Sequence, residues 1–334
     1  MSIENSFRSG ISRYAFAFVL AVLPLQASAL DLTPDASRII SDPAYLPLQG
    51  QIYGSSQYSY SRTTSNTNNY LGAPKSSNTT TTNGLNQVIA YGVTDDFTLR
   101  MSDSYDWRTS DSNPTSGAGT QSSSNGFSDP AFGATWRVID QKTYPISWDL
   151  IGSYAPDLIN AKSASPTQDG TIARGGATAT AGTALSYETK DFTVYGEGSA
   201  TYLGSRDTLN QTSGITTNYD SSWQYALALN TQTRLTDLVS VNAGVTETFN
   251  NSADASFISG GSLTSFTSEP GDVTELNAAL NFQVIPDRLV ASVVYAHYFY
   301  DNSSNNYAAL PHSDTTVRDE SEDSVTANLR YILN

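Results

Sequence analysis

Two histidines and one short acidic run are the residues whose types could support catalysis or metal binding in this chain. His297 lies among aromatic residues, and the residue that would share its face of a strand two positions later is Phe299, not serine. His312 follows Pro311 and precedes Ser313. A hydrolase needs a nucleophile within reach of a base, and neither histidine has one at a suitable spacing. The neighbouring residues indicate that His297 lies at a membrane interface and His312 in a solvated loop. We therefore expect no enzymatic activity and no catalytic residues.

The acidic run comprises Asp319, Glu320, Glu322 and Asp323. Carboxylates of this kind could bind a divalent cation, but the run has neither the spacing nor the turn glycine of an EF-hand. It is typical of the solvated base of a loop. The chain has no cysteine, and no phosphate loop, dinucleotide fingerprint or zinc spacing is present. We expect no metal and no cofactor.

Charge narrows the choice of partners further. The formal net charge of −15 at pH 7 argues against nucleic acid, because phosphate binding needs a basic surface. The same charge favours cations over anions as solutes.

The first 29 residues have the three parts of a secretory signal. Arg8 and Arg13 precede an apolar run over residues 14–25, and Ala27-Ser28-Ala29 supplies a small-x-small cleavage site. The run is too short to span a bilayer. A buried N-terminal helix is the alternative interpretation. The signal predicts cleavage after Ala29 and a bacterial protein that works outside the cytoplasm.

From residue 50 onward, apolar and polar residues alternate with period two in twelve segments. Such alternation gives a strand one apolar and one polar face. Asp103 and Glu247 interrupt the apolar phase, which indicates either a place near a rim or a one-residue slip of register. The segments are 52–60, 85–93, 97–107, 132–138, 144–154, 177–187, 192–202, 223–235, 239–249, 276–284, 289–299 and 325–333.

The connections between these segments alternate in length. Tight turns stand at 94–96, 140–142, 189–190, 236–237 and 286–287, and long Ser/Thr/Asn-rich connections at 63–83, 109–126, 155–173, 205–221, 251–271 and 301–319. Short periplasmic turns and long extracellular loops are typical of outer-membrane barrels. A soluble β-sandwich would not need connections that alternate so regularly between short and long. The sequence thus predicts an all-β fold, a transmembrane antiparallel up-and-down β-barrel of about twelve strands over residues 50–334, with both termini on the periplasmic side.

Charged residues fall mostly on the polar phase, opposite all four tryptophans. A lipid-facing charge near mid-membrane costs roughly 2–4 kcal/mol, so we expect these residues to line the lumen. The candidates for selectivity are Arg100, Arg137, Asp149 and Glu197. The alternative for each is a structural hydrogen bond or ion pair within the lumen.

Residues 30–49 precede the first expected strand. Thr33-Pro34 could begin a short helix through Ile40, since proline is tolerated at the first helical position, and Pro43 and Pro47 then break regularity. We expect either a periplasmic tail or a small plug folded into the lumen.

Residues 126–137 read GFSDPAFGATWR, Tyr154-Ala155-Pro156 closes the next expected strand, and Gly175-Gly176 leads the one after. This pattern, over about residues 120–205, resembles the outer-membrane proteins grouped as the putative MetA-pathway phenol-degradation family. The resemblance implies a barrel that passes hydrophobic or aromatic compounds. Two departures stand out: Asp157 follows Pro156 where the family often has Thr-Gly, and the chain ends without a terminal aromatic residue.

These observations predict a passive outer-membrane channel for small, including hydrophobic or aromatic, molecules. A twelve-stranded lumen should be narrow, because eight strands are filled by side chains and sixteen leave an open pore. The alternative is a non-transporting surface protein whose Ser/Thr/Asn-rich loops mediate contacts. We expect as partners outer-membrane lipid and lipopolysaccharide, the barrel-assembly machinery during insertion, and an unidentified small solute.

Overall fold

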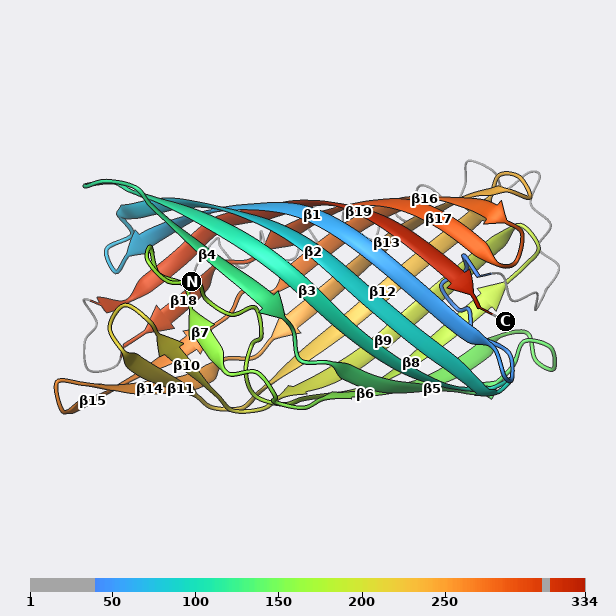
Figure 1. The fold of residues 1–334 in the computed structure, drawn as a ribbon, viewed down its shortest axis with the longest axis horizontal. Helices are drawn as coiled ribbons and strands as arrows, with labels where there is room; N and C mark the ends of the chain where they lie inside the picture. The colour runs from blue at the N-terminus through green and yellow to red at the C-terminus, as the bar shows by residue number, and fades with distance from the viewer. Residues whose placement is uncertain (1–39, 308–312, 334) are drawn as a thin grey trace, which may run out of the picture.

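The computed structural model describes residues 40–307 and 313–333, and these residues form antiparallel strands that close into a barrel (Figure 1). The expected signal peptide, residues 30–39 and His312 lie outside the described residues. Within the described part of the chain, no helix is long and apolar enough to cross a membrane.

Twelve of the described strands form the ring, each paired with the next along the chain, and β1 closes the ring by pairing with β19 as well as with β2. The ring strands are β1 (Ile52–Asn69), β2 (Pro74–Thr94), β3 (Phe97–Pro114), β5 (Ala131–Ile139), β6 (Ser147–Ala155), β8 (Thr178–Glu188), β9 (Phe192–Leu203), β12 (Ser222–Arg234), β13 (Val239–Asn250), β16 (Val273–Ile285), β17 (Leu289–Tyr300) and β19 (Thr315–Ile332). The predicted fold class and the strand number are therefore confirmed.

The two ends of the barrel differ. The short connections all lie at one end, here called the turn end, and the long connections lie at the other, the loop end (Figure 1). Additional strands extend the wall at the loop end: β4 (Thr120–Phe127), β7 (Ala161–Ser163), β10 (Arg206–Asn210), β11 (Ile215–Tyr219), β14 (Ala253–Ser259), β15 (Ser262–Glu269) and β18 (Ser303–Asn306).

The long connections are more regular than the sequence suggested. The β1–β2 hairpin continues to Asn69 and Pro74, so most of the expected loop 63–83 is strand. Ser, Thr and Asn are typical of loops, but paired backbones satisfy their hydrogen-bonding groups equally well in a hairpin that is polar on both faces. The acidic run likewise lies within β19. At the turn end one strand is shorter than expected. Tyr144 and Ile146 precede β6, because Pro145 between them cannot donate a hydrogen bond to the neighbouring strand.

The outward face carries an apolar band. One phase of the ring strands exposes large apolar side chains, as strand alternation requires when that face meets lipid. Members of the band include Leu85, Ile89, Leu99, Met101, Phe132, Trp136, Leu150, Leu185, Leu227, Leu280, Val293, Val325 and Leu329. Aromatic residues flank it at the loop end, where Tyr60, Trp107, Phe127, Tyr202, Trp223, Phe249 and Phe299 are exposed.

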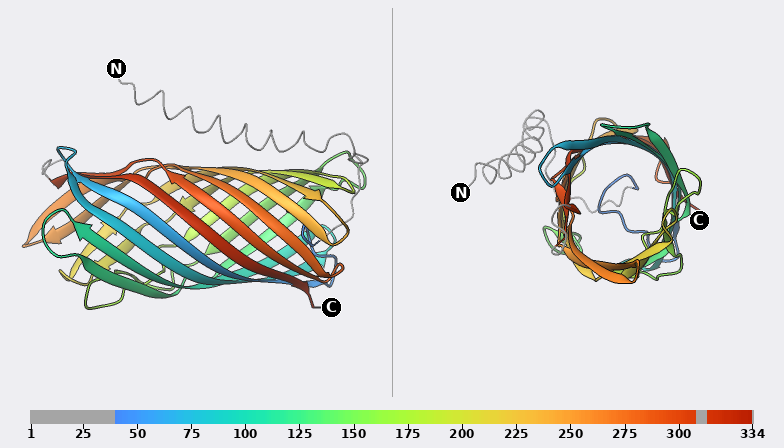
Figure 2. Two further views of the ribbon diagram at one scale, coloured as in Figure 1. Left: turned by 90° about the horizontal axis from the view of Figure 1, so that it is seen from above. Right: turned by 90° about the vertical axis from the view of Figure 1, so that its left-hand side faces the viewer.

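Residues 40–50 lie inside the ring at the turn end (Figure 2). We call them the inner segment. Ile40, Ala44 and Leu46 are buried, and the backbone N–H of Gly50 donates a hydrogen bond to the carbonyl of Gly92 in β2. The described chain therefore starts and ends at the turn end of the barrel.

Candidate functional site

Many of the side chains that line the lumen wall are small and polar, with alanines and valines such as Val88 and Val294 between them. The phase opposite the apolar band points inward, because alternate side chains of a strand face opposite sides. Away from the charged positions, the inward residues of the middle of the wall include Ser55, Gln57, Ser59, Asn86, Gly84, Thr98, Ser102, Thr180, Gly182, Ser199, Ala226, Ala228, Asn230, Asn242, Gly244, Thr246, Asn277, Ala279, Asn281, Ser292, Thr326 and Asn328.

Hydrogen bonds cross the seams between these strands. Ser55 Oγ donates to Asn328 Oδ1 at 2.9 Å, which joins β1 to β19. Ser292 Oγ donates to Asn281 Oδ1 at 2.7 Å, and Asn281 Nδ2 donates to Asn242 Oδ1 at 2.8 Å, which links β17, β16 and β13. Such side-chain pairs hold neighbouring strands in register and leave the lumen lined with amides and hydroxyls.

One amide row shows how closely this wall is packed. Asn230, Gly244 and Asn277 are direct neighbours on β12, β13 and β16. A Cβ atom built on Gly244 would lie 2.1 Å from Asn230 Oδ1 and 2.8 Å from Asn277 Oδ1. The two amides reach across Gly244 from either side, and a larger residue there would require them to move.

The inner segment is attached to the wall by arginine and glutamine side chains. Arg234 Nη2 and Asp42 Oδ2 form an ion pair at 3.0 Å, and both groups are largely buried. Gln232 Nε2 donates to Asp42 Oδ1 and, at 3.2 Å, to Ser41 Oγ. Arg330 Nη1 donates to the Ser41 carbonyl at 3.1 Å. The wall thus binds both the side chains and the backbone of the segment.

Asp42 is the titratable group of this attachment. Burial raises the pKa of its carboxyl from 3.8 to about 6, although Arg234 and Arg330 lower it. Glu188, at the end of β8, also faces Asp42 closely enough for the two carboxylates to repel. Protonation of Asp42 therefore favours the docked segment.

Arg137 and Asp149, two of the predicted residues, form a second attachment point. Arg137 Nε lies 2.8 Å from Asp149 Oδ1, and Arg137 Nη2 lies 3.0 Å from Asp149 Oδ2 in a two-pronged pair. The same nitrogen donates to the Ala44 carbonyl of the inner segment at 2.7 Å. With relative exposures of 5% and 4%, these residues hold the segment as well as facing the lumen.

The other two predicted residues stand apart from this pair. Arg100 borders a cavity of about 280 Å³ between the inner segment and the wall, which Arg330, Tyr53 and Leu46 also line. Glu197 accepts a hydrogen bond of 2.7 Å from the Tyr195 hydroxyl on the same strand. The structure therefore joins two of the four predicted residues and separates the other two.

Sequence reasoning missed the residues that bind Asp42. Gln232 and Arg234 end a strand next to a tight turn and carry no motif. Their partners lie some 190 positions earlier in the chain, and no pattern in the sequence links them.

Farther toward the loop end, the lumen carries carboxylates with neutral partners. Glu275, Tyr298 and Glu322 face one another in register across β16, β17 and β19. Glu322 accepts a hydrogen bond from Thr63 Oγ1 at 2.8 Å and another from the Tyr300 hydroxyl at 3.1 Å. Among the described residues, neither glutamate forms an ion pair, so both add unpaired negative charge to this part of the lumen.

His297 lies on the outward face, next to an acid from the predicted acidic run. Its Nδ1 is 2.8 Å from Asp323 Oδ1, to which the Tyr295 hydroxyl also donates at 2.6 Å. The Phe299 ring meets the imidazole edge to face, with centroids 4.4 Å apart. Because β19 alternates, Glu320 and Glu322 face inward while Asp323 faces outward. Within residues 40–307 and 313–333, no cluster of three or more metal-ligating side chains forms.

The two residues that interrupted the apolar phase do not mark a register slip. Glu247 pairs directly with Thr274, whose hydroxyl donates to it at 2.8 Å, three residues before β13 ends. Asp103 faces outward beside Gln87, where β4 and β5 leave a break in the wall. A position near the rim is therefore correct for Glu247.

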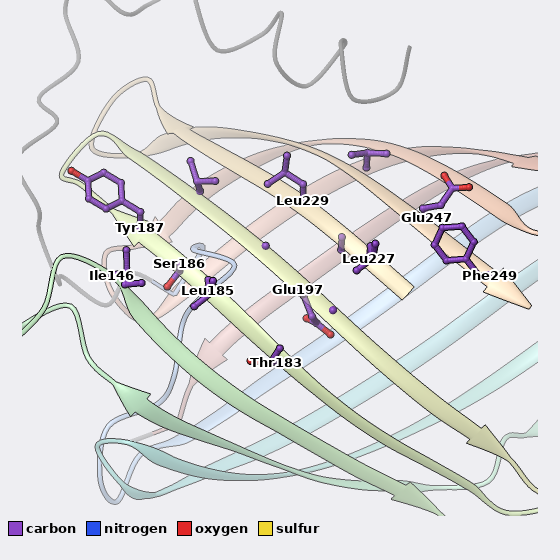
Figure 3. A pocket seen from close by; sticks show the side chains of 15 residues that line it. Ile146, Thr183, Leu185, Ser186, Tyr187, Glu197, Leu227, Leu229, Glu247 and Phe249 are labelled. Atoms are coloured by element: carbon purple, nitrogen blue, oxygen red, sulfur yellow. The ribbon is translucent and has the colours of Figure 1, made fainter. Parts of the chain in front are cut away.

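An apolar groove of about 640 Å³ runs over the outward face of β8, β9, β12 and β13 (Figure 3). Gly196 and Gly198 form its floor, and Leu185, Leu227 and Phe249 stand around it. Most of its lining side chains belong to the outward face, and Ser186 and Glu197 of the inward phase border it as well.

No protein-family model and no curated protein matches the sequence. Solved structures of outer-membrane proteins match over most of both chains, and two of them have TM-scores above 0.5. The COG4313 outer membrane channel from Pseudomonas putida F1 shares 14% identity, covers 87% of this chain and 99% of its own, and has a TM-score of 0.54. The transport unit of the autotransporter AIDA-I from Escherichia coli shares 14% identity, covers 95% and 97%, and has a TM-score of 0.53. The fold is that of an outer-membrane β-barrel.

Proposed function

We propose that this protein is a passive channel of the bacterial outer membrane, with the ring of twelve strands as its wall and the inner segment as its narrowest section. One observation carries the proposal: the ring is closed, with apolar residues outside and hydrogen-bonding residues inside. This distribution suits a barrel with lipid around it and water within it. The similarity to the P. putida channel agrees in fold.

The inner segment sets how freely solutes pass. It is held at Asp42 by Arg234 and at Ala44 by Arg137. The cavity of about 280 Å³ beside it shows that the segment does not fill the cross-section. We infer a small, cation-preferring conductance, since Glu275 and Glu322 add negative charge to the lumen beyond the segment.

The proposed channel has partners in the membrane around it and in the lumen. The outward band contacts membrane lipid, and the aromatic belt at the loop end lies at the level of lipopolysaccharide headgroups. The barrel-assembly machinery inserts the chain, and the small solute is its transported partner.

Single-channel recording in planar bilayers tests this function. The protein should give discrete openings, and deletion of residues 41–48 should raise the conductance several-fold, because the deletion removes the segment from the lumen. The matched control shortens the β14–β15 hairpin by the pairs Ser256–Ser265 and Phe257–Thr264, outside the ring, and should leave conductance unchanged. Folded protein without openings over a range of salt concentrations would exclude a channel.

A further inference from the structure

The chemistry of the lumen wall narrows the class of solute, an inference that rests on the proposed channel function. The inward amides and hydroxyls are distributed round the ring rather than gathered in one patch. Thr180 and Thr201 hydroxyls meet at 2.9 Å across β8 and β9, and Gln224 Nε2 donates to Asn250 Oδ1 at 2.8 Å across β12 and β13. The Thr80 and Ser110 hydroxyls meet at 2.9 Å across β2 and β3.

These pairs leave many hydrogen-bonding positions free for a solute. An amide offers two donor hydrogens and two acceptor lone pairs, and a hydroxyl offers one donor and two lone pairs. A single bond to a neighbour, as between Ser55 and Asn328, uses only part of that capacity. The remainder binds water, or a solute that presents hydroxyl groups in place of water.

An apolar solute would be disfavoured in the same lumen. It would displace water from amides such as Asn230 and Asn277 and return no hydrogen bonds, which leaves polar groups unpaired. Sites that hold apolar ligands are lined mostly by aliphatic and aromatic side chains. Here most of the large aliphatic and aromatic side chains form the outward band, with Leu227 and Leu229 on the opposite face from Asn230.

We propose that the channel passes small, neutral, multiply hydroxylated solutes, that is, polyols and monosaccharides, rather than hydrocarbons or simple aromatic compounds. As the solute moves along the lumen, it exchanges hydrogen bonds with water for hydrogen bonds with successive rows of wall residues. The Asn230–Gly244–Asn277 row is one of these binding positions. Because the exchange is nearly balanced, the solute is not trapped.

Vesicle swelling tests the solute class on the full chain. Proteoliposomes should swell in isosmotic arabinose or glucose faster than vesicles without protein. In planar bilayers a trisaccharide added to one side should interrupt the current, whereas toluene at aqueous saturation should not. Current without polyol swelling, or interruption by toluene but not by the saccharide, would overturn this inference and leave the channel function standing. Absence of current would instead overturn the channel function.

A pair of variants separates chemistry from size. The double variant Asn230→Leu, Asn277→Leu keeps side-chain volume and removes the amides; it should slow polyol swelling roughly threefold to tenfold, the factor that about one lost hydrogen bond supplies. The double variant Asn230→Ser, Asn277→Ser keeps polarity in smaller side chains and should swell at least as fast as the parent. Heat-modifiable mobility on gels shows that each variant is folded. Equal swelling of the leucine variant and the parent would contradict the proposal.

Discussion

Two contacts between a basic side chain and a carboxylate have the same length in this barrel and very different surroundings. Arg137–Asp149, at the turn end, and His297–Asp323, nearer the loop end, both measure 2.8 Å. The first pair is 3% and 6% exposed and faces the lumen; the second is 28% and 63% exposed and faces outward. Distance alone therefore says little about the energy of such a pair, which depends on how much water each partner loses.

The same contrast separates the two halves of the lumen. At the turn end, Arg234 pairs with the carboxylate of Asp42, and Arg137 and Arg330 donate to backbone carbonyls of the inner segment. Toward the loop end, Glu275 and Glu322 have hydroxyl and amide partners, and their charge acts on the solution. In the proposed channel, the first half narrows the lumen and the second half selects what enters it.

Loss of the Arg137 guanidinium should have the largest effect. Arg137→Ala leaves Asp149 buried and unpaired and removes the donor to Ala44, so the free energy of unfolding should fall by about 3–5 kcal/mol. Urea titration of the protein in lipid vesicles measures the change. The double variant Arg137→Met, Asp149→Leu removes both charges and should be less destabilised than Arg137→Ala. If the double variant has the lower free energy of unfolding, the unpaired Asp149 is not the cause of the destabilisation in Arg137→Ala.

Docking of the inner segment should depend on pH through Asp42. The pKa of the docked carboxyl is about 6, above the ordinary 3.8, so its contribution to docking is complete below about pH 4 and is lost as pH rises through 6. The shift corresponds to at most about 3 kcal/mol. Conductance should therefore increase between pH 5 and pH 7.5.

Asp42→Asn should abolish this pH dependence, because the amide does not titrate. Asp287→Asn makes the same change in an exposed turn at the same end and should retain it; asparagine also tolerates the positive φ of 56° found there. A pH response that persists in Asp42→Asn would assign it to other groups, such as Glu188, whose carboxylate is repelled by that of Asp42.

The ring was predictable because each of its features repeats along the chain. Twelve alternating segments and five tight turns specify strands, order and facing without any long-range information. The pairing of Arg137 with Asp149 was also within reach, since a hairpin centred on the turn at Thr143 brings these two positions opposite each other.

The attachment of the inner segment could not be predicted in the same way. Asp42 meets Gln232 and Arg234 only because the barrel closes, and closure is a property of the whole ring. The β1–β2 hairpin illustrates a different limit. Its Ser, Thr and Asn residues have loop-like composition, and only the partner strand determines that they are paired.

Neutralising the acids near the loop end should change selectivity without changing the fold. The double variant Glu275→Gln, Glu322→Gln keeps hydrogen bonding to Asn277, Thr63 and Tyr300 and removes two charges. The preference for cations over anions should fall about threefold to tenfold, the effect of about 1 kcal/mol. Reversal potentials in a salt gradient measure it. Glu247→Gln, on the outward face, is the control and should leave the reversal potential unchanged.

The exposed pair should give the smallest effect and completes the comparison with Arg137–Asp149. His297→Ala removes a contact that is open to solvent, so the free energy of unfolding should fall by about 0.2–1 kcal/mol, well below the loss for Arg137→Ala. His297→Gln keeps a donor for Asp323 and should lose less. The Phe299 ring packs on the imidazole, so a double-mutant cycle with Asp323→Asn isolates the pair from that contact. A coupling energy as large as that of Arg137 and Asp149 would show that the outward face excludes water from Asp323, and burial would then fail as the explanation for the difference between the two ends.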